Sequence, residues 1–292
     1  GKGTITRRTL TVGTVAAQTK IYDGTTSADA AQFHAGLNNV VSGEESSVTA
    51  TATGAAYNDK TVAGANVVNY TGVKLQGTGA GNYAIADTAQ GAGTITKRAL
   101  TVGTVAAQSK TYDGTTSADT SKFQATLGNL VAGEEGSVTA TAAGAAYNDK
   151  NVAAANAVSY TGVALTGTGA GNYSIADTAQ GKGTITKRAL TLGTVTAQTK
   201  IYDGTTAADA ALTNAIVGDS VAATATGAAY NSKNVAAAST IGYTGVALSG
   251  ADAGNYSLAA TTAQGAGTIT ARELTLGTVA SQSKTYDGTR AA

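Results

Sequence analysis

The sequence predicts an all-β protein, with tandem antiparallel β-sandwich or β-grasp-like domains of about 90 residues forming an elongated rod. Tyr22, Tyr112 and Tyr202 stand 90 residues apart, so the 292-residue chain repeats itself. Short runs rich in Thr, Val, Tyr and Ile alternate apolar with polar residues, and glycine clusters bound them. No stretch keeps the period of about 3.6 residues that a helix requires.

The copies follow one another without a Pro-, Ser- or Gly-rich linker, through segments of the type "GTIT-KR-ALT". We predict the end of a preceding repeat at 1–6, complete repeats at 7–96, 97–186 and 187–270, and the start of a fourth at 271–292. The third copy is seven residues shorter than the others between Tyr202 and Tyr230. Such short connections should restrict interdomain movement, and contacts between neighbouring copies should add stability.

The strands of the first copy can be assigned in order. The runs "TLTVGTV" (9–15) and "SVTATATG" (47–54) alternate with a period of two, which predicts strands with one face toward water. The run "NYTGVKLQG" (69–77) changes face at Gly72, which suggests a bulge. "GNYAIAD" (81–87) and "GTIT" (93–96) predict two more strands, and "SADAAQFHAGL" (27–37) predicts a helical turn.

Four tyrosines per copy are the only regularly recurring large side chains of a lean Ala, Val, Leu and Ile core. We expect each ring to cap the core, with its hydroxyl bonded to the backbone or facing solvent. The recurring positions are Tyr22, Tyr112 and Tyr202; Tyr57, Tyr147 and Tyr230; Tyr70, Tyr160 and Tyr243; and, in the "GNY" triplets, Asn82-Tyr83, Asn172-Tyr173 and Asn255-Tyr256.

The motif "YDGTT" predicts a tight turn, because Gly accepts a positive φ and Asp bonds to backbone amides two residues on. The turn residues are Asp23-Gly24, Asp113-Gly114 and Asp203-Gly204. The functional alternative is a Ca²⁺ or sugar contact through the aspartate. Ca²⁺ takes about six or more oxygen ligands, usually from several carboxylates. The motif offers one carboxylate, so Asp23, Asp113 and Asp203 are weak metal candidates.

Two further motifs resemble active-site elements. The pairs Glu44–Glu45 and Glu134–Glu135 invite a catalytic interpretation, but the third copy retains only Asp219, which favours a loop tip. The run "GAGNY" (79–83) resembles a phosphate loop, but a strand follows it where a phosphate loop needs a helix, so it predicts a hairpin turn.

The remaining polar residues favour structural roles. His34 occurs once, without a counterpart in the second copy, which is typical of a surface residue. The basic residue that recurs at Arg8, Arg98 and Arg188 predicts a salt bridge to an adjacent domain, through Asp87 or Asp177. A Lys–Asn isopeptide involving Lys20 or Lys60 is an alternative that needs a buried acid beside the pair. The "YNDK" aspartates Asp59 and Asp149 give way to Ser232, which disfavours an obligatory metal or catalytic aspartate there.

Composition excludes several function classes. A net charge of +1 with mixed signs provides no basic stripe for nucleic acid. The absence of cysteine excludes disulfides and thiolate sites, and no run of about 18 apolar residues predicts a membrane span. No catalytic or metal constellation recurs, so we expect neither an enzyme nor a cofactor. Because the sequence has no methionine, we expect it to be an internal piece of a longer protein.

The motifs "KIYDGTT", "AAYNDKNVA", "YTGVALSGADAGNYSL" and "GTIT-x-R-x-LT", in this order, resemble the YDG repeat of bacterial surface proteins, a relative of MBG-type repeats. The resemblance covers the whole chain. One departure is that the family commonly has proline after "TIT", whereas Arg7, Lys97, Lys187 and Ala271 stand there. The resemblance implies a large filamentous-haemagglutinin-like adhesin, exported by two-partner secretion to the surface or surroundings of a Gram-negative bacterium.

Two function hypotheses follow. In the first, the repeats are a structural stalk or extracellular fibre; in the second, they are glycan- or ion-binding modules that use the recurring Tyr and Asp/Asn. The expected partners are neighbouring repeats and copies of the chain itself in a fibre. Host or surface glycans or proteins would be bound through regions outside this fragment. The two hypotheses differ in tyrosine exposure, because a binding platform leaves aromatic faces open and a stalk buries them.

Overall fold

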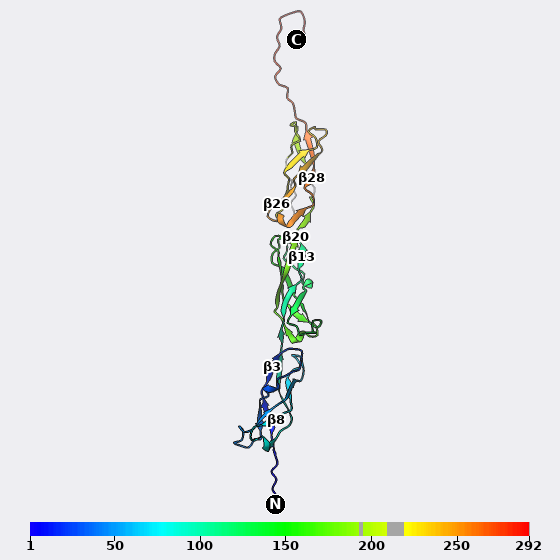
Figure 1. The fold of residues 1–292 in the computed structure, drawn as a ribbon. Helices are drawn as coiled ribbons and strands as arrows, with labels where there is room; N and C mark the ends of the chain where they lie inside the picture. The colour runs from blue at the N-terminus through cyan, green and yellow to red at the C-terminus, as the bar shows by residue number, and fades with distance from the viewer. Residues whose placement is uncertain (193–194, 209–218, 292) are drawn as a thin grey trace. The chain divides into compact units, whose positions relative to one another are not determined.

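A computed structural model describes residues 1–192, 195–208 and 219–291 (Figure 1). Regular structure in these residues consists of strands and short 3-10 turns, which confirms the all-β class and the tandem small domains. Contacts divide the chain into two compact units. One comprises Gly1–Ser109, Thr116–Asp149 and Ala155–Thr184, and the other Lys110–Thr115, Lys150–Ala154 and Ile185–Ala292. The second unit thus combines two loops of repeat 2 with repeat 3.

Repeat 1 is built around one mixed sheet. Its elements are β1 (Arg8–Thr9), β2 (Thr11–Val15), β3 (Gln18–Ile21), η1 (Ala30–Gln32), β4 (Ala35–Asn38), β5 (Thr49–Thr51), β6 (Gly54–Tyr57), β7 (Val67–Thr71), β8 (Lys74–Gln76), η2 (Ala80–Asn82), β9 (Tyr83–Ala84) and β10 (Thr88–Thr96). The main sheet has the order β3-β10-β7-β6, and the pairs β1·β9, β2·β4 and β5·β8 form small sheets beside it.

Repeat 2 follows the same order, and so do the described elements of repeat 3. Repeat 2 contains β11 (Arg98–Ala99), β12 (Thr101–Val105), β13 (Gln108–Thr111), η3 (Thr120–Lys122), β14 (Ala125–Gly128), β15 (Thr139–Thr141), β16 (Gly144–Tyr147), β17 (Ala157–Thr161), β18 (Ala164–Thr166), η4 (Ala170–Asn172), β19 (Tyr173–Ser174) and β20 (Thr178–Thr186). Repeat 3 contains β21 (Arg188–Leu190), β22 (Gln198–Ile201), β23 (Ala222–Thr224), β24 (Gly227–Tyr230), β25 (Thr240–Thr244), β26 (Ala247–Ser249), η5 (Ala253–Asn255), β27 (Tyr256–Leu258) and β28 (Thr262–Thr270).

The sheets are mixed, so the predicted antiparallel pairing holds for only some of the strand pairs. β10 runs antiparallel to β7 but parallel to β3, with Gly93 opposite Gln18, and β1 runs parallel to β9. A parallel pair needs a long crossover, and the body of the repeat between β3 and β10 provides it. As a result the carboxyl ends of β3 and β10 lie together, and the Tyr22 amide donates to the Thr96 carbonyl at 2.9 Å.

Two local predictions around Gly72 and Gly79 were wrong. Gly72, at φ +63°, does not form a bulge within one strand, because the chain leaves the main sheet there and continues as β8, which pairs with β5. "GAGNY" is not a hairpin turn, because β8 and β9 on either side of it pair with different strands. The predicted strand at 47–54 is shorter, with β5 covering Thr49–Thr51.

The predicted helical turn in 27–37 is confirmed as the 3-10 turn η1 at Ala30–Gln32. The Asp29 carboxylate caps it by accepting the Ala31 amide at 2.9 Å. The chain then forms β4, which pairs with β2, with Leu37 opposite Val12.

Glycines on β10 make room for the tyrosine rings of the core. The inward-facing positions of β10 alternate with exposed ones and include Gly91 and Gly93. A Cβ at Gly93 would lie 2.7 Å from Val68 and 3.0 Å from the Tyr57 ring, and one at Gly91 would lie 2.9 Å from Val15. The large rings can therefore lie directly over the strand backbone, which explains how a lean core is filled.

Among the described residues, the predicted salt bridges from Arg8, Arg98 and Arg188 to Asp87 or Asp177 are not found. Arg8 donates to the Asn39 side chain at 2.6 Å, and Arg98 donates to the Asn129 side chain at 2.7 Å, each within its own repeat. Both asparagines adopt φ +71°, which Asn tolerates better than most residues. The ion pairs found among the described residues join a lysine and an aspartate three positions apart.

The turn glycine Gly167 provides a test of this packing. It has φ +107°, and a Cβ there would lie 2.3 Å from the Ser137 carbonyl oxygen. We expect Gly167→Ala to destabilise repeat 2 by about 2 kcal/mol or more, because it adds backbone strain and a clash. Gly171→Ala is the matched control, since its Cβ would meet no atom within 4 Å. Urea unfolding measures both variants, and equal midpoints would contradict the described turn.

Candidate functional site

The "YDG" turn is held by its own aspartate and a lysine from β3. The Lys20 ammonium lies 2.7 Å from Asp23 Oδ1, which also accepts the Thr25 amide at 2.9 Å. Gly24 has φ +79°, as a turn of this kind requires. Lys110 with Asp113 and Lys200 with Asp203 repeat the arrangement at 2.7 and 2.9 Å.

The weak metal candidates Asp23, Asp113 and Asp203 therefore each bind an ammonium. The lysine beside it and the threonine two residues on lower the pKa of Asp203 to about 2, and Lys110 is the main cause of a pKa of about 2 at Asp113. Within the described ranges, no group of three or more His, Cys, Asp or Glu side chains is placed to hold a metal ion. The lysine occupies the place that a cation would need.

Tyr22 connects repeat 1 to repeat 2 within the first compact unit. Its side chain is 1% exposed, and its hydroxyl donates to Glu134 Oε1 at 2.5 Å. Its ring meets the Tyr173 ring edge-on, with centroids 5.3 Å apart and an interplanar angle of 80°. Tyr22 thus does more than cap its own core, because one apolar cluster continues through it into repeat 2.

Glu134 lies in the loop between β14 and β15, as predicted, but its carboxylate accepts hydrogen bonds from both tyrosines, which the sequence did not indicate. The Tyr173 hydroxyl donates to Glu134 Oε2 at 2.6 Å and accepts the Val131 amide at 3.1 Å. The second residue of the pair, Glu135, is exposed and accepts the Gly133 amide at 3.3 Å. The two glutamates therefore have different roles, and the tyrosine hydroxyls meet a carboxylate where a backbone group or solvent was expected.

A backbone contact completes this junction. The Val62 amide of repeat 1 donates to Asn172 Oδ1 at 3.0 Å, and Asn172 is buried. Gly24 is close as well, because a Cβ there would lie 3.0 Å from the Val131 side chain. We call Tyr22, Gly24 and Val62 the tyrosine face of repeat 1. We call Val131, Glu134, Asn172 and Tyr173 the carboxylate face of repeat 2.

The second compact unit contains an equivalent junction between repeat 2 loops and repeat 3. Tyr112 meets Tyr256 edge-on at 5.3 Å and 74°, and the Val152 amide donates to Asn255 Oδ1 at 2.8 Å. The Tyr256 hydroxyl donates to Asp219. The shorter Asp219 takes the place of glutamate here. Among the described residues the buried Tyr112 hydroxyl has no bond of normal geometry.

A comparison with protein families matches the YDG domain three times, at residues 6–90, 96–180 and 186–263. The chain belongs to the YDG domain family. Each match begins one residue before a predicted repeat start, at 7, 97 and 187. A comparison with curated protein sequences found no match. In the described part of the chain, no helix is long and apolar enough to cross a membrane.

The carboxylate face of a YDG domain forms within one repeat. In repeat 1, the Tyr83 hydroxyl donates to Glu44 Oε2 at 2.5 Å and accepts the Val41 amide at 3.1 Å, as Tyr173 does in repeat 2. The bonds between tyrosine and carboxylate therefore do not depend on the neighbouring repeat.

The other two tyrosines of each YDG domain lie inside the repeat. The Tyr70 hydroxyl accepts Gln18 Nε2 at 2.7 Å, and Tyr57 packs below the Lys20 ammonium, 5.4 Å from its ring centroid. Sequence reasoning missed Gln18, although its counterparts Gln108 and Gln198 recur at the same spacing. Tyr147 and Tyr230, the counterparts of Tyr57, are buried in the same way.

Burial and the junction carboxylates raise tyrosine pKa values. Burial and the Glu134 carboxylate raise the pKa of Tyr22 and that of Tyr173 above the usual range. The Asp219 carboxylate and burial raise the pKa of Tyr256 to about 12. The neutral phenol that can donate to the carboxylate is therefore the favoured form in the folded protein.

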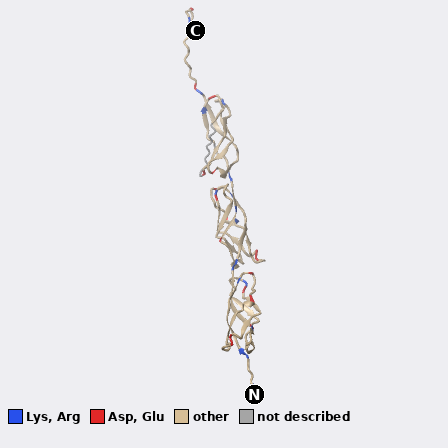
Figure 2. Cartoon of the chain, turned by 60° about the vertical axis from the view of Figure 1, so that its left-hand side comes forward, with Lys and Arg blue, Asp and Glu red and all other residues tan. Residues whose placement is uncertain are grey.

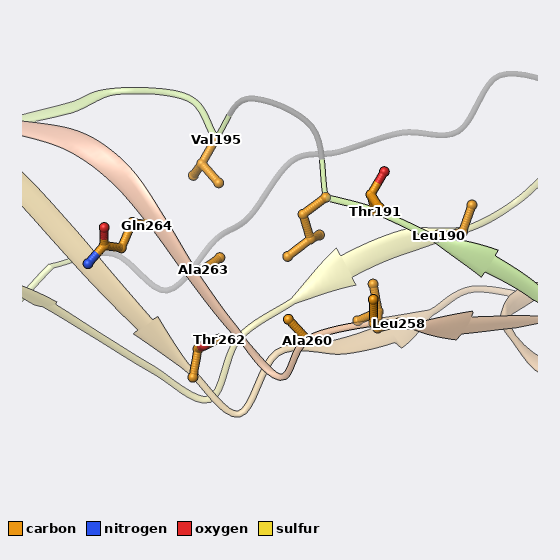
Figure 3. Close-up of a pocket in the computed structure, with 10 residues that line it drawn as sticks. Leu190, Thr191, Val195, Leu258, Ala260, Thr262, Ala263 and Gln264 are labelled. Carbon is orange, nitrogen blue, oxygen red and sulfur yellow. The ribbon is translucent and has the colours of Figure 1, made fainter.

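A pocket among the described residues is lined without a titratable side chain. It lies in repeat 3, has a volume of about 280 Å³, and is lined by leucine, valine, alanine and threonine with Gln264 (Figure 3). Figure 2 shows charged residues of both signs as short separated segments on a mostly uncharged chain.

Glu134 offers a test of the junction. We expect Glu134→Ala to cost about 2 to 4 kcal/mol, because two buried hydroxyls lose an ionic acceptor. The readout is amide hydrogen exchange at Val62, whose bond to Asn172 closes the same junction. Glu135→Ala is the matched control, since Glu135 is exposed and accepts the Gly133 amide. Unchanged protection of Val62 in Glu134→Ala would show that the carboxylate does not hold the junction.

The raised tyrosine pKa values predict weakening at alkaline pH. A folded pKa above the ordinary 10.0 means that the stabilising contribution is complete below pH 10.0 and is lost as the pH rises through the folded value, about 12 for Tyr256. We expect the urea midpoint to stay level from neutral pH to about pH 10 and to fall between about pH 10 and about pH 12. Tyr256→Phe should reduce the slope, since it removes one titrating hydroxyl. A midpoint independent of pH in this range would contradict the assignment.

Proposed function

We propose that this run of YDG domains is a non-enzymatic structural segment of a secreted bacterial adhesin of the filamentous-haemagglutinin-like type. It extends a binding region from the surface of a Gram-negative cell or builds the body of an extracellular filament. The observation that carries this proposal is the junction of Tyr22 and Tyr173 on one Glu134 carboxylate.

A stalk needs joints that resist bending, and this junction supplies directional contacts. Charge-assisted hydrogen bonds are shorter and stronger than neutral ones, and edge-on aromatic pairs have a preferred geometry. The covalent connection is also short, since a single residue, Lys97, separates β10 from β11. To bend between repeats 1 and 2, the chain would have to break the hydrogen bonds of Tyr22 and Tyr173 to Glu134 and also change the backbone conformation at Lys97.

The repetition itself suits a structural role. Tyr22 and Tyr112 present the same turn, and Asn172 and Asn255 accept the equivalent amides of the preceding repeat. Because each repeat has both a tyrosine face and a carboxylate face, a repeat can be added or removed and the remaining repeats still form the same junction. The number of copies then sets the length of the segment.

The binding-module alternative receives less support. It requires open aromatic faces, whereas eleven of the thirteen tyrosines are buried. Tyr202 is half-buried, and Tyr286 is 93% exposed in the extended segment after β28. The recurring aspartates of the turns already bind lysine. Extracellular placement rests on the resemblance to secreted repeat proteins.

Small-angle scattering of the 292-residue chain tests the stalk. We expect a narrow distribution of end-to-end dimensions for the wild type and a broader, shorter one for Glu134→Ala combined with Asp219→Ala. The control combines Glu45→Ala with Glu135→Ala, which removes the same charge away from the tyrosines. The stalk proposal fails if wild type and the junction variant have the same broad distribution. Specific hits of the wild type on a glycan array would instead support the binding module.

A further inference from the structure

Two phenol rings and one carboxylate meet at the junction of repeats 1 and 2. The Tyr22 and Tyr173 rings lie edge-on, with centroids 5.3 Å apart. Their hydroxyls donate to the two oxygens of Glu134 at 2.5 and 2.6 Å. Because the two oxygens belong to one carboxylate, the ring edges that carry the hydroxyls face the same group. The junction therefore brings two phenols from different repeats together with a shared proton acceptor.

Phenols in such a setting can be coupled by oxidation. Loss of one electron makes the phenolic proton strongly acidic, so tyrosine is oxidised most readily where a base accepts that proton. A carboxylate already hydrogen-bonded to the hydroxyl is such a base. The unpaired electron of the resulting phenoxyl radical is shared between the oxygen and the ring carbons ortho to it. Glu134 is placed to serve both tyrosines in this way.

We propose that Tyr22 and Tyr173 are a site of oxidative cross-linking, at which a carbon–carbon bond between the two rings closes the junction covalently. Each tyrosine loses one electron, and its hydroxyl proton leaves by way of the Glu134 carboxylate. The two radicals combine through one ortho carbon of each ring. The hydrogen on each bonded carbon then moves to the phenolic oxygen, which restores both hydroxyls.

The reaction balances with a peroxide as the oxidant. One carbon–carbon bond forms and two carbon–hydrogen bonds break, so the chain loses two hydrogen atoms, as two electrons and two protons. The peroxide takes up the two electrons as its O–O bond breaks. The two protons go to the reduced peroxide or to solvent.

Burial makes this pair selective. Tyr22 and Tyr173 are each 1% exposed, so their radicals are shielded from solvent and from other chains while they lie against each other. Tyr286, at 93% exposed, would instead couple with groups it meets in solution. The Tyr70 ring packs on Phe33, which has no hydroxyl and forms no phenoxyl radical.

The second junction provides an internal comparison. Tyr112 and Tyr256 also lie edge-on at 5.3 Å, and the Tyr256 hydroxyl donates to Asp219. The Tyr112 hydroxyl has no bond of normal geometry within the described part of the chain. We expect a lower yield of cross-link here, because one phenol lacks a well-placed proton acceptor. The inference does not rest on the stalk proposal, since it concerns a bond within one chain.

Photo-oxidation of the full chain tests the site. The protein is illuminated with a tris-bipyridine ruthenium complex, and persulfate is the peroxide that accepts the electrons. After trypsin digestion, Tyr22 lies in peptide 21–60 and Tyr173 in peptide 151–182. We expect the monomeric fraction to contain these two peptides joined, with a mass equal to their sum less two hydrogen atoms. Fragmentation then locates the bond, because each peptide contains a second tyrosine.

Variants assign the groups. Tyr22→Phe and Tyr173→Phe each keep the ring but remove the hydroxyl, and each should abolish the joined peptides. Glu134→Gln should lower their yield about tenfold or more, because an amide oxygen is a poor proton acceptor. Glu135→Gln and Tyr286→Phe are the matched controls and should cross-link as the wild type does.

The inference is overturned if the monomeric wild type shows no bond between Tyr22 and Tyr173, or joins them no more often than tyrosines that lie apart, such as Tyr22 and Tyr83. A yield that is unchanged in Glu134→Gln overturns the role of the carboxylate, as does an equal yield at the second junction. None of these outcomes affects the scattering test of the unoxidised chain, so the two proposals fail separately.

Discussion

Two buried tyrosine hydroxyls on one carboxylate are the interaction on which the organisation of this protein depends. Tyr22 and Tyr173 come from different repeats, and Glu134 lies between them with one oxygen for each. A half-buried carboxylate such as that of Glu134 is costly unless its oxygens accept hydrogen bonds, and buried phenols likewise need acceptors. The hydrogen bonds offset the desolvation cost of the carboxylate and of both hydroxyls, so loss of the carboxylate leaves both hydroxyls without their acceptor.

The core contains few types of large side chain, which explains why the tyrosines contribute to so many of its contacts. The repeats lack Trp, Met, Pro and Cys, so tyrosine supplies most of the large apolar surface. Small residues on β10, such as Gly93, let those rings lie against the strand backbone. The Tyr22 ring belongs to an apolar cluster that includes Leu100 and Tyr173 of the next repeat, so the domains share part of their core.

Much of the fold was accessible from the chain alone, because its signals are local. The period, the alternation in "TLTVGTV", the turn at Asp23-Gly24 and the helical turn near Ala30 depend on nearest neighbours. The face change at Gly72 was visible but was interpreted as a bulge, since sequence does not tell whether a strand continues in its sheet or joins another. The sequence also contains a signal for the role of Glu134, because the third copy is seven residues shorter in this region and still has a carboxylate at Asp219.

The sequence by itself determined the repeat, the β class and the positions of the tyrosines and turns, because each of these follows from spacing and local backbone preference. Only the tertiary structure decided that β3 runs parallel to β10 and that Tyr22 meets a glutamate 112 positions away. Contacts at such separation leave no periodic pattern, since they depend on which surfaces the folded repeats bring together. For the same reason Glu134 and Glu135 look alike in the chain and differ only once the fold turns one of them toward the tyrosines.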